Sequence, residues 1–454
     1  MATTVEERGG PSGTSGAAPA ASDEARGWYA VVVITIVGML AQIDRGVLAL
    51  LVEPIKRDLK LTDTQVSLLI GFAFTFFYMI VGPVVARLGD TRSRTRIMAV
   101  GLTIWSVATA LCGVAQSFLG LFFARALVGG GESMNGPASM SLVSDCVKRD
   151  RLPRAYAILN MGIMAGMGLA LVIGGVAMGL VADVAPIPIG PFGVIRNWQL
   201  VFLIVGIPGL LLAILLVLTV PEPARRGVQR PGGLPLKEVI GFVWARRAIH
   251  LPLFVALTMM SIQNFGLGAW APAFYQRTYG WSPATIGPIL GSVSLVTGPL
   301  GLLIGTRLAE LMASRRDDAN LRVLMLAQLL PIPFGIAGPL MPTPEAAIAC
   351  AAAAAVLGVM GGASYSAALQ IVTPNEMRGQ VNALYLFAIS ALGGAIGPTF
   401  VALLTDHVAG SPDRLRYVLS GMRACLGPGI VLLIWLTLKP YAAAYRAAVD
   451  AERD

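Results

Sequence analysis

Long apolar stretches, separated by short polar segments, follow one another along almost the whole of this chain. Each stretch is about 20 residues or longer, the length of a helix that crosses roughly 30 Å of hydrocarbon. A backbone surrounded by lipid must satisfy its own hydrogen bonds, so we predict transmembrane helices rather than short alternating barrel strands. The twelve predicted spans are residues 28–51, 64–86, 97–115, 118–143, 155–181, 200–220, 249–275, 284–306, 321–341, 345–372, 379–405 and 417–438.

The composition supports an all-α integral membrane protein. Apolar residues make up 56% of the 454 residues and charged residues only 13%, too few to cover the surface of a soluble protein of this length. The net charge of +9 does not indicate nucleic-acid binding, because the basic residues occur in short clusters between apolar runs. We therefore expect membrane lipids as the surroundings and no nucleic-acid partner.

The basic residues also predict the orientation of the chain. If both termini are cytoplasmic, 24 Lys and Arg residues fall on the cytoplasmic side and seven on the outside. Because Lys and Arg are enriched in cytoplasmic loops, this bias predicts cytoplasmic termini. We expect a multi-pass monomer in the plasma membrane, which is the inner membrane if the cell is bacterial.

Two halves of six predicted spans each repeat one another. Arg87-Leu88-Gly89-Asp90 follows the second span, and Arg307-Leu308-Ala309-Glu310 follows the eighth span, 220 residues later. Two pseudo-symmetric six-helix bundles with a site between them are typical of transporters. The expected organisation is a disordered cytoplasmic tail at 1–27, an N-terminal bundle at 28–220, a basic cytoplasmic linker at 221–248, a C-terminal bundle at 249–440 and a cytoplasmic tail at 441–454.

The loop after the second span carries a motif. Residues 86–96 resemble the loop signature of the major facilitator superfamily, although Ala86 and Ser93 replace two glycines and Thr91 replaces an arginine. Two further stretches resemble the entry and exit of the sixth helix in that superfamily: Asn197-Trp198-Gln199 and Val220-Pro221-Glu222-Pro223. The resemblance implies the major facilitator fold over nearly all of residues 28–440.

Within that superfamily, the first part of the chain resembles the Spinster-type lipid transporters. This resemblance lies mainly in the first 160 residues, in Ile43-Asp44-Arg45, Leu51-Val52-Glu53-Pro54-Ile55-Lys56, Leu61-Thr62-Asp63-Thr64-Gln65 and Gly130-Gly131-Glu132. It implies transport of an amphiphilic lipid, and it assigns coupling and headgroup binding to Asp44, Arg45 and Glu132.

Five charged residues lie deep inside the predicted spans, at least six residues from either end, where each costs on the order of 2.5–3.5 kcal/mol to insert. Asp44 and Arg45 lie on the first span, Arg125 and Glu132 on the fourth, and Arg423 on the twelfth. Seven residues bring a helix back to within about 20° of the same face, so Arg125 and Glu132 should point the same way. Adjacent residues point about 100° apart, so Asp44 and Arg45 need not share a partner.

These charges favour a proton-coupled site. We interpret Asp44 and Glu132 as proton-binding carboxylates, because burial and a neighbouring arginine act in opposite directions on the proton affinity of a carboxylate. Arg45 and Arg125 are then their partners or ligands of the substrate headgroup, and Glu132 is also a candidate substrate ligand. A fixed ion pair that pins the first helix to the fourth is the structural alternative. Arg423 lies near enough to the end of its span to reach the membrane surface.

A second group of charges lies in the predicted cytoplasmic loops. We expect Asp90 and Asp145 to pair with the arginines around them, including Arg87 and Arg94. The superfamily resemblance implies that this network closes the cytoplasmic side when the site faces outward. Glu310 is the C-terminal counterpart of Asp90, whereas the position that matches Asp145 holds no carboxylate. Positive-inside anchoring is the alternative for most of the arginines.

The C-terminal bundle offers polar candidates for the substrate cavity, namely Gln263, Asn264, Tyr365, Asn382 and Tyr385. Glycines at three- and four-residue spacing in the fifth and eleventh spans predict close helix packing or a sliding contact. The chain has no Walker-type phosphate loop, and its four cysteines and two histidines lack metal-site spacing. We therefore expect no cofactor, no metal and no enzymatic activity, with an ion gradient or the substrate's own gradient as the energy source.

The sequence favours a secondary active transporter that is coupled to protons and moves amphiphilic lipids, such as lysophospholipids or sphingolipid-like molecules. The five intramembrane charges sum to +1, which suits an anionic or zwitterionic headgroup better than a cation. The nearest alternative is a proton-driven drug or organic-anion carrier of the same fold. A membrane scaffold has no need of buried Asp and Arg, and a lipid hydrolase would require a catalytic cluster that the sequence lacks.

Overall fold

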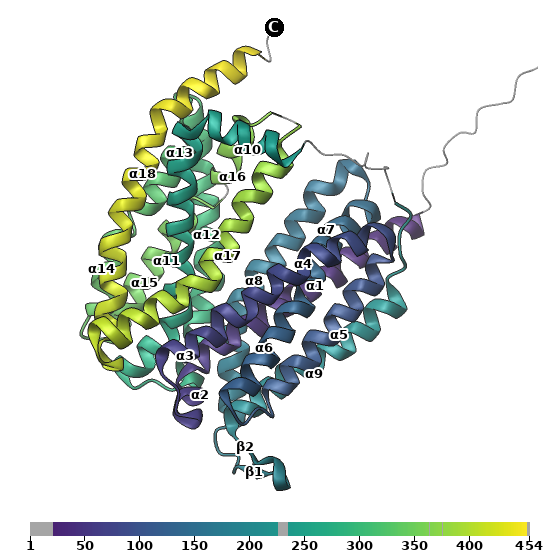
Figure 1. Cartoon of the computed structure of the whole chain (residues 1–454), viewed down its shortest axis with the longest axis vertical. Helices are drawn as coiled ribbons and strands as arrows, with labels where there is room; N and C mark the ends of the chain where they lie inside the picture. The colour runs from purple at the N-terminus through teal and green to yellow at the C-terminus, as the bar shows by residue number, and fades with distance from the viewer. Residues whose placement is uncertain (1–20, 226–234, 363, 375, 452–454) are drawn as a thin grey trace, which may run out of the picture.

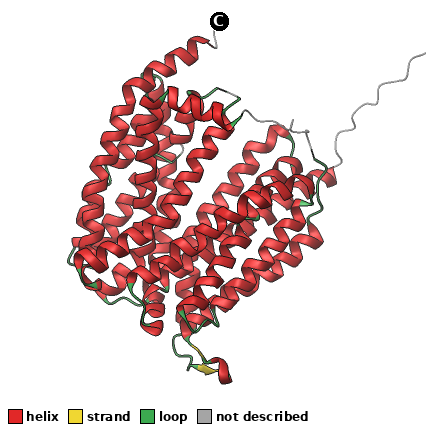
Figure 2. Ribbon diagram, in the orientation of Figure 1, coloured by secondary structure: helices red, strands yellow, loops and turns green. Residues whose placement is uncertain are grey.

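The structure, a computed structural model, describes residues 21–225, 235–362, 364–374 and 376–451, and these are nearly all helical (Figure 2). The helices of the N-terminal bundle are α1 (Ala21–Leu50), α2 (Val52–Leu59), α3 (Asp63–Ser67), the π-helical η1 (Leu68–Phe72), α4 (Ala73–Thr91), α5 (Arg94–Cys112), α6 (Phe118–Glu132), α7 (Asn135–Cys146), η2 (Arg149–Arg151), α8 (Leu152–Leu180), η3 (Gly190–Phe192) and α9 (Asn197–Thr219). Two short antiparallel strands, β1 (Ile187–Pro188) and β2 (Val194–Ile195), form a hairpin before α9.

The linker contributes α10 (Leu236–Ala245), and the C-terminal bundle follows it. Its helices are α11 (Arg247–Tyr279), α12 (Pro283–Ala313), α13 (Ala319–Leu329), α14 (Ile332–Ala337), η4 (Gly338–Leu340), α15 (Pro344–Val359), α16 (Ser364–Ile371), α17 (Arg378–Leu403), the π-helical η5 (Leu404–Ala409), η6 (Pro412–Arg414) and α18 (Leu415–Ala451).

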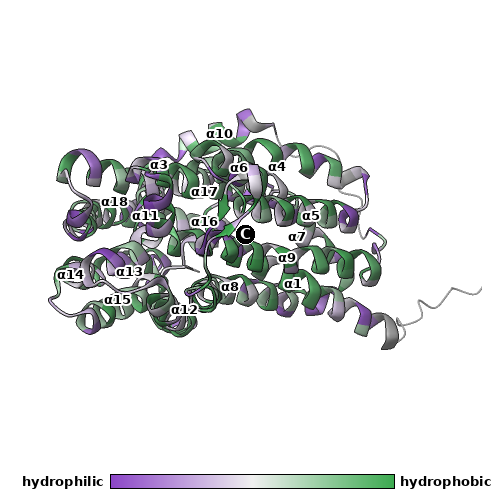
Figure 3. Ribbon diagram, turned by 90° about the horizontal axis from the view of Figure 1, so that it is seen from below, coloured by the Kyte–Doolittle hydropathy of each residue, from purple (hydrophilic) through white to green (hydrophobic). Residues whose placement is uncertain are grey.

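The predicted all-α membrane architecture is confirmed. Among the described residues, eleven helices are long and apolar enough to cross a membrane. The fourth predicted span is divided instead into α6 and α7, because Ser133 and Met134 interrupt the helix. Taken together, α6 and α7 supply the twelfth span. The helices are largely hydrophobic along their length, with hydrophilic residues mainly near their ends (Figure 3).

The two bundles lie side by side and diverge toward one end of the molecule (Figure 1). We call the end that carries β1 and β2 the hairpin end, and the end that carries α10 the linker end. The bundles lie against one another toward the hairpin end, where α2 and α3 reach the C-terminal bundle (Figure 1).

Glycines allow the close helix contacts that hold this arrangement. Within the N-terminal bundle, α1 packs on α8, and a Cβ added at Gly46 would lie 2.4 Å from the Cβ of Ala170. Between the bundles, α8 packs on α12, and a Cβ added at Gly175 would lie 2.4 Å from the ring of Pro288. The prediction of close packing along the glycines of the fifth span is thus confirmed.

Helices extend into three segments that the sequence analysis assigned to a tail or to the linker. Residues 21–27 form the first turns of α1 rather than part of a disordered tail, because Glu24 pairs with Lys148 at 3.3 Å and also with Arg151. Residues 1–20 lie outside the described part of the chain. The linker contains α10, and α18 continues through the predicted C-terminal tail as far as Ala451.

Candidate functional site

The four charges predicted on the first and fourth spans lie together in the N-terminal bundle. Asp44 and Arg45 come from α1, and Arg125 and Glu132 come from α6. Asp44, Arg125 and Glu132 are each at most 2% exposed. We call these four residues the charge cluster.

Arg45 and Glu132 form a direct ion pair across α1 and α6. The Nε and Nη2 atoms of Arg45 donate to the same oxygen of Glu132, Oε2, at 2.7 and 2.6 Å. The guanidinium of Arg45 also lies over the rings of Phe74, at 4.5 Å from the ring centre, and Tyr78, at 5.5 Å. The Arg45 side chain is 35% exposed whereas that of Glu132 is fully buried, so the pair is open from the side of Arg45.

Asp44 uses a different partner from its neighbour. The hydroxyl of Thr109 on α5 donates to Oδ2 of Asp44 at 2.5 Å. Oδ1 of Asp44 and Oε1 of Glu132 are buried and have no hydrogen-bond partner among the described residues. Buried carboxylate oxygens normally accept at least one hydrogen bond. Each of these two oxygens can therefore still accept a proton or a hydrogen bond from a ligand.

Arg125 is a buried guanidinium with unused donors. Its Nε and Nη1 atoms have no hydrogen-bond partner in the described part of the chain, and it lies 5.6 Å from the centre of the Phe74 ring. One aromatic ring thus contacts both arginines of the cluster. An unpaired buried guanidinium favours an anionic group nearby, either a carboxylate of the protein or part of a ligand.

The geometry predicted from helix periodicity is confirmed for this cluster. Arg125 and Glu132 are both directed into the bundle, and adjacent Asp44 and Arg45 serve separate partners. The break after Glu132 was not predicted. Glu132 is the last residue of α6, and a Cβ added at Gly131 would lie 2.8 Å from the backbone N of Trp105, so α6 approaches α5 closely just before the break.

A second polar cluster lies at the linker end of the N-terminal bundle. Arg94 at the start of α5 contacts Asp145 at the end of α7, and its Nε donates to Glu222 at 2.8 Å. Glu222 also accepts from the Ser93 hydroxyl at 2.8 Å and from the Thr95 backbone N–H at 2.9 Å. Partial burial alone would raise the pKa of Glu222, but the bonds from Thr95, Arg94 and Ser93 outweigh burial and lower it.

The predicted Arg94–Asp145 contact is therefore confirmed, and Glu222 is an additional member that the sequence analysis did not assign. The signal was present, since Glu222 lies in the exit motif of the sixth span. Arg87 is exposed, and the side chain of Asp90 lies outside the described residues. Glu310 pairs with Arg307 at 3.0 Å within one exposed turn of α12, so it does not reach the N-terminal bundle in this structure.

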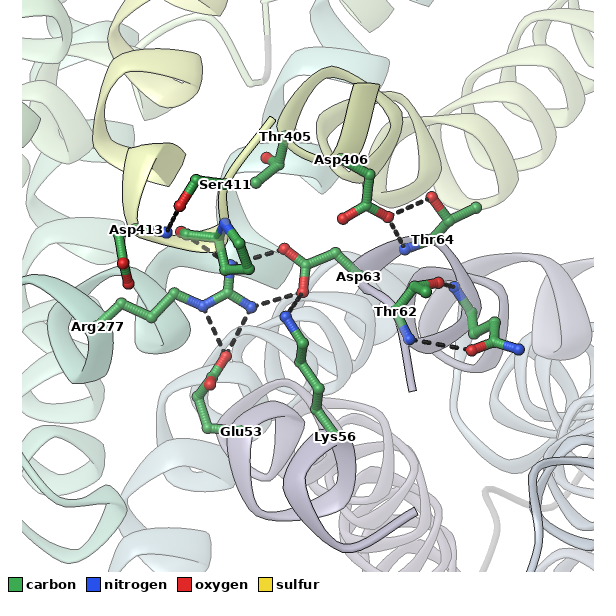
Figure 4. Close-up of polar contacts among 12 residues, drawn as sticks. Glu53, Lys56, Thr62, Asp63, Thr64, Arg277, Thr405, Asp406, Ser411 and Asp413 are labelled. Atoms are coloured by element: carbon green, nitrogen blue, oxygen red, sulfur yellow. Dashed lines mark hydrogen bonds and ion pairs between the residues drawn. The ribbon is translucent and has the colours of Figure 1, made fainter. Parts of the chain in front are cut away.

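An ion-pair network that the sequence analysis did not predict joins the bundles at the hairpin end (Figure 4). Arg277 of α11 donates to both carboxylate oxygens of Asp63, at 2.7 and 2.8 Å, and to Glu53 at 2.7 Å. Lys56 contacts the same Asp63 at 2.5 Å. Arg277 is the single member from the C-terminal bundle, so its bonds join the two bundles. We call Glu53, Lys56, Asp63 and Arg277 the hairpin-end latch.

Neighbouring hydrogen bonds support the latch. Asp406 of η5 accepts from both the backbone N–H and the hydroxyl of Thr64, at 2.9 and 2.7 Å. The side chain of Gln276 donates to the carbonyl of Leu50 at 3.1 Å. The sequence does contain charged loop residues of opposite sign in its two halves. Sequence spacing alone, however, does not show which loops of different bundles come into contact.

The polar candidates of the C-terminal bundle separate into two groups. Gln263 is fully buried and accepts from Arg423 at 3.1 Å, and Tyr385 is 1% exposed and donates to the carbonyl of His250 at 3.0 Å. In this structure, these two side chains bond within their own bundle, and their role as cavity residues stays a prediction. The remaining candidates are at least partly exposed: Asn264, Tyr365 and Asn382.

Two six-helix bundles, joined at one end and diverging at the other, with buried charges inside one bundle, define a multi-pass membrane transporter rather than an enzyme. Residues 34–398 match the family model of the Major Facilitator Superfamily. The chain belongs to this superfamily.

Its relatives include efflux and Spinster proteins. An "MFS-type efflux pump" of Mycolicibacterium smegmatis is 29% identical over 385 residues, which are 84% of this chain and 85% of that protein. "Protein spinster homolog 1" of Xenopus tropicalis is 25% identical over 321 residues, which are 67% of this chain and 58% of that protein. The chain is thus related to the Spinster proteins, although the match spans little more than half of that relative.

Solved structures show the same fold. The structure of a bacterial homologue of the human lysosomal transporter Spinster, described as inward-facing and unoccupied, superposes with a TM-score of 0.75 at 24% identity. The superposition covers 94% of this chain and 98% of that one. The structure of a nucleoside transporter at 12% identity still gives a TM-score of 0.67. Structural similarity at this level therefore identifies the fold and not the substrate.

Proposed function

We propose that this protein is a proton-coupled secondary active transporter of amphiphilic lipids with an anionic or zwitterionic headgroup. The observation that carries the proposal is the charge cluster, in which the Arg45–Glu132 pair is partly open while Asp44 and Arg125 are buried. Charges inside a membrane are expensive, so they mark ion and substrate pathways.

The proton-binding groups are Asp44 and Glu132. Each has one bonded oxygen and one buried oxygen without a partner, so each can accept a proton without first losing a hydrogen bond. Protonation of Glu132 removes the negative charge that holds Arg45. Arg45 is then free to bind an anionic group of the substrate, which couples proton and headgroup binding at one site.

The headgroup ligand is Arg45, assisted by Arg125. Arg45 is 35% exposed, and its planar guanidinium suits a phosphate or carboxylate better than a lysine ammonium does. The aromatic rings of Phe74 and Tyr78 hold this guanidinium in place. Asn264, Tyr365 and Asn382 of the C-terminal bundle complete the proposed substrate path.

Alternating access follows from the two ends of the molecule. The hairpin-end latch holds the bundles together in this state, whereas the bundles diverge at the linker end (Figure 1). In the opposite state, Arg87, Asp90, Arg94 and Asp145 close the linker end. With both termini cytoplasmic, as the basic residues predict, the linker end faces the cytoplasm, and the protein acts as a monomer in the plasma membrane.

A drug or organic-anion carrier is the second candidate. The observation that favours it is the match to a protein named an MFS-type efflux pump, of which 85% is aligned. Both candidates use the same charge cluster, and they differ in whether binding energy comes from an acyl tail. Each buried methylene contributes about 0.8 kcal/mol, so dependence on tail length separates them.

Transport by purified protein in sealed vesicles tests the proposal. We expect uptake of a fluorescent lysophospholipid to follow an imposed pH gradient, to stop when a protonophore collapses it, and to weaken when the C16 tail is shortened to C8. Uptake of small hydrophilic anions with no effect of tail length would reject lipid transport and support the carrier. Lipid uptake at the same rate with and without the pH gradient would reject proton coupling.

A further inference from the structure

The linker helix α10 presents an exposed face that its own bundle does not cover. Ile240 and Trp244 are 53% and 65% exposed, and four residues apart they lie on the same face of the helix. Val239 on the opposite side is fully buried and belongs to the core that α11 and α17 share. The helix is therefore attached by one face and free on the other.

Basic residues flank this apolar face at both ends. Lys237 precedes Ile240 by three residues, so Lys237, Ile240 and Trp244 lie on one side of α10, and Arg247 follows at the start of α11, just after the turn at Arg246. Both basic side chains are exposed, and neither has an ion-pair partner in the described part of the chain. We call Lys237, Ile240, Trp244 and Arg247 the linker face.

The backbone around the linker face is fixed to the C-terminal bundle. The side chain of Arg246 donates to the carbonyl of Val372 at 2.6 Å and lies over the ring of Phe242 at 4.8 Å. The helix lies at the linker end in Figure 1 and at the outer edge of the molecule in Figure 3. It is thus held at the level where the spans end, with the linker face turned away from the protein core.

We propose that the linker face binds the anionic surface of the membrane leaflet at the linker end, with Ile240 and Trp244 in the region between headgroups and acyl chains and with Lys237 and Arg247 on lipid phosphates. A tryptophan with an adjacent aliphatic side chain suits the interface. Two free cations at the ends of an apolar face match a negatively charged lipid layer, which the cytoplasmic leaflet supplies under the predicted orientation. The lipid composition then acts on the linker end of the C-terminal bundle through α10.

The depth of Trp244 is tested by quenching in vesicles of phosphatidylcholine and phosphatidylglycerol. Wild-type protein and Trp244→Phe are reconstituted with lipids brominated near the headgroup, and the difference in fluorescence isolates Trp244. We expect bromine to quench this contribution and aqueous iodide to leave it unchanged. Quenching by iodide alone would place the face in water, and protection from both quenchers would place a protein partner or a second copy on it. Either result overturns the proposal.

The charge preference is tested by thermal unfolding of the full-length protein in detergent with added lipid. Phosphatidylglycerol should stabilise the wild type at lower concentration than phosphatidylcholine. The double variant Lys237→Gln/Arg247→Gln should need on the order of tenfold more phosphatidylglycerol for the same effect. Arg315→Gln/Arg316→Gln is the matched control, because these two arginines are exposed at the linker end of the same bundle. Equal loss in both double variants would mean that general surface charge, and not the linker face, attracts the lipid.

Discussion

Asp63 of the N-terminal bundle accepts hydrogen bonds from both terminal nitrogens of Arg277 in the C-terminal bundle, at 2.7 and 2.8 Å. Asp63 is fully buried and the Arg277 side chain is 5% exposed, so this pair is shielded from water and salt. The pair therefore contributes to the stability of the state that is closed at the hairpin end.

Removing one partner of this pair should open the hairpin end. Asp63→Ala leaves Arg277 buried without its bidentate partner, which should destabilise the closed state by about 3–5 kcal/mol. Spin labels at Asp183 and Glu345, both exposed at the hairpin end, should show a new population at longer distance. Arg307→Gln, which breaks the exposed Arg307–Glu310 pair, should leave the distribution unchanged. An unchanged distribution in Asp63→Ala would mean that packing alone closes this end.

Asp44→Asn should abolish proton-driven transport while the protein remains folded. The substitution keeps the size of the side chain and its bond to Thr109, but the amide cannot take up a proton. Uptake under a pH gradient should fall to the level without a gradient. Asp183→Asn is the control at an exposed carboxylate. Wild-type uptake by Asp44→Asn would remove Asp44 from the coupling mechanism.

Arg45→Lys should weaken binding of a lysophospholipid by about tenfold, a loss of about 1.4 kcal/mol. Lysine cannot donate to Glu132 through two nitrogens or lie flat over Phe74, as Arg45 does. Equilibrium binding to purified protein in detergent measures the effect, with free aqueous lipid as the concentration. Arg154→Lys, an exposed change of the same kind, serves as the control. Equal affinity of the wild type and Arg45→Lys would show that the headgroup binds elsewhere.

Glu222→Gln should destabilise the protein at neutral pH and have little effect in acid. The pKa of Glu222 in the folded protein lies below the ordinary value of about 4.3, so its carboxylate contributes stability above that value and loses the contribution as pH falls through the folded pKa. Thermal unfolding at pH 7 should therefore show a lower midpoint for the variant, and the difference should shrink as the pH approaches 4. A difference that stays constant over this range would assign the effect to packing.

Gly71→Ala should disturb the contact between η1 and α17. A Cβ at this position would lie 2.4 Å from the carbonyl oxygen of Gly394, which is closer than real Cβ contacts. The closed hairpin end should therefore be less populated, by the same spin-label measurement used for Asp63. Gly268→Ala is a suitable control, because a Cβ there meets nothing within 4 Å. Wild-type distances in Gly71→Ala would show that η1 shifts to accommodate the methyl group.

Hydropathy was sufficient to predict the spans, and helix periodicity was sufficient to predict that Arg125 and Glu132 point the same way and that Asp44 and Arg45 have separate partners. Both rest on regularities that continue along one helix. The break at Ser133 and Met134 has a different signal: Gly129-Gly130-Gly131 precedes it and Asn135-Gly136-Pro137 follows it, and Pro137 lacks the N–H that would donate to the carbonyl of Ser133. Contacts between distant loops, such as Arg277 with Asp63, depend on how the two bundles are docked, which local sequence does not encode. Tertiary contacts likewise fold residues 21–27, whose composition alone favours disorder.

The division of the fourth span into α6 and α7 gives its two pieces separate attachments. Glu132, at the end of α6, is tied to α1 through Arg45, and Asp145, near the end of α7, is tied to α5 through Arg94. Between the pieces, the backbone N–H of Ser133 still donates to the carbonyl of Gly129 at 3.1 Å, whereas that of Met134 donates to Gly131 at 3.2 Å, one residue short of the α-helical pattern. The two pieces therefore meet at one tightened turn. The fourth span therefore connects two polar sites through a single turn of chain: the charge cluster at the end of α6 and the cluster of Arg94, Asp145 and Glu222 near the end of α7.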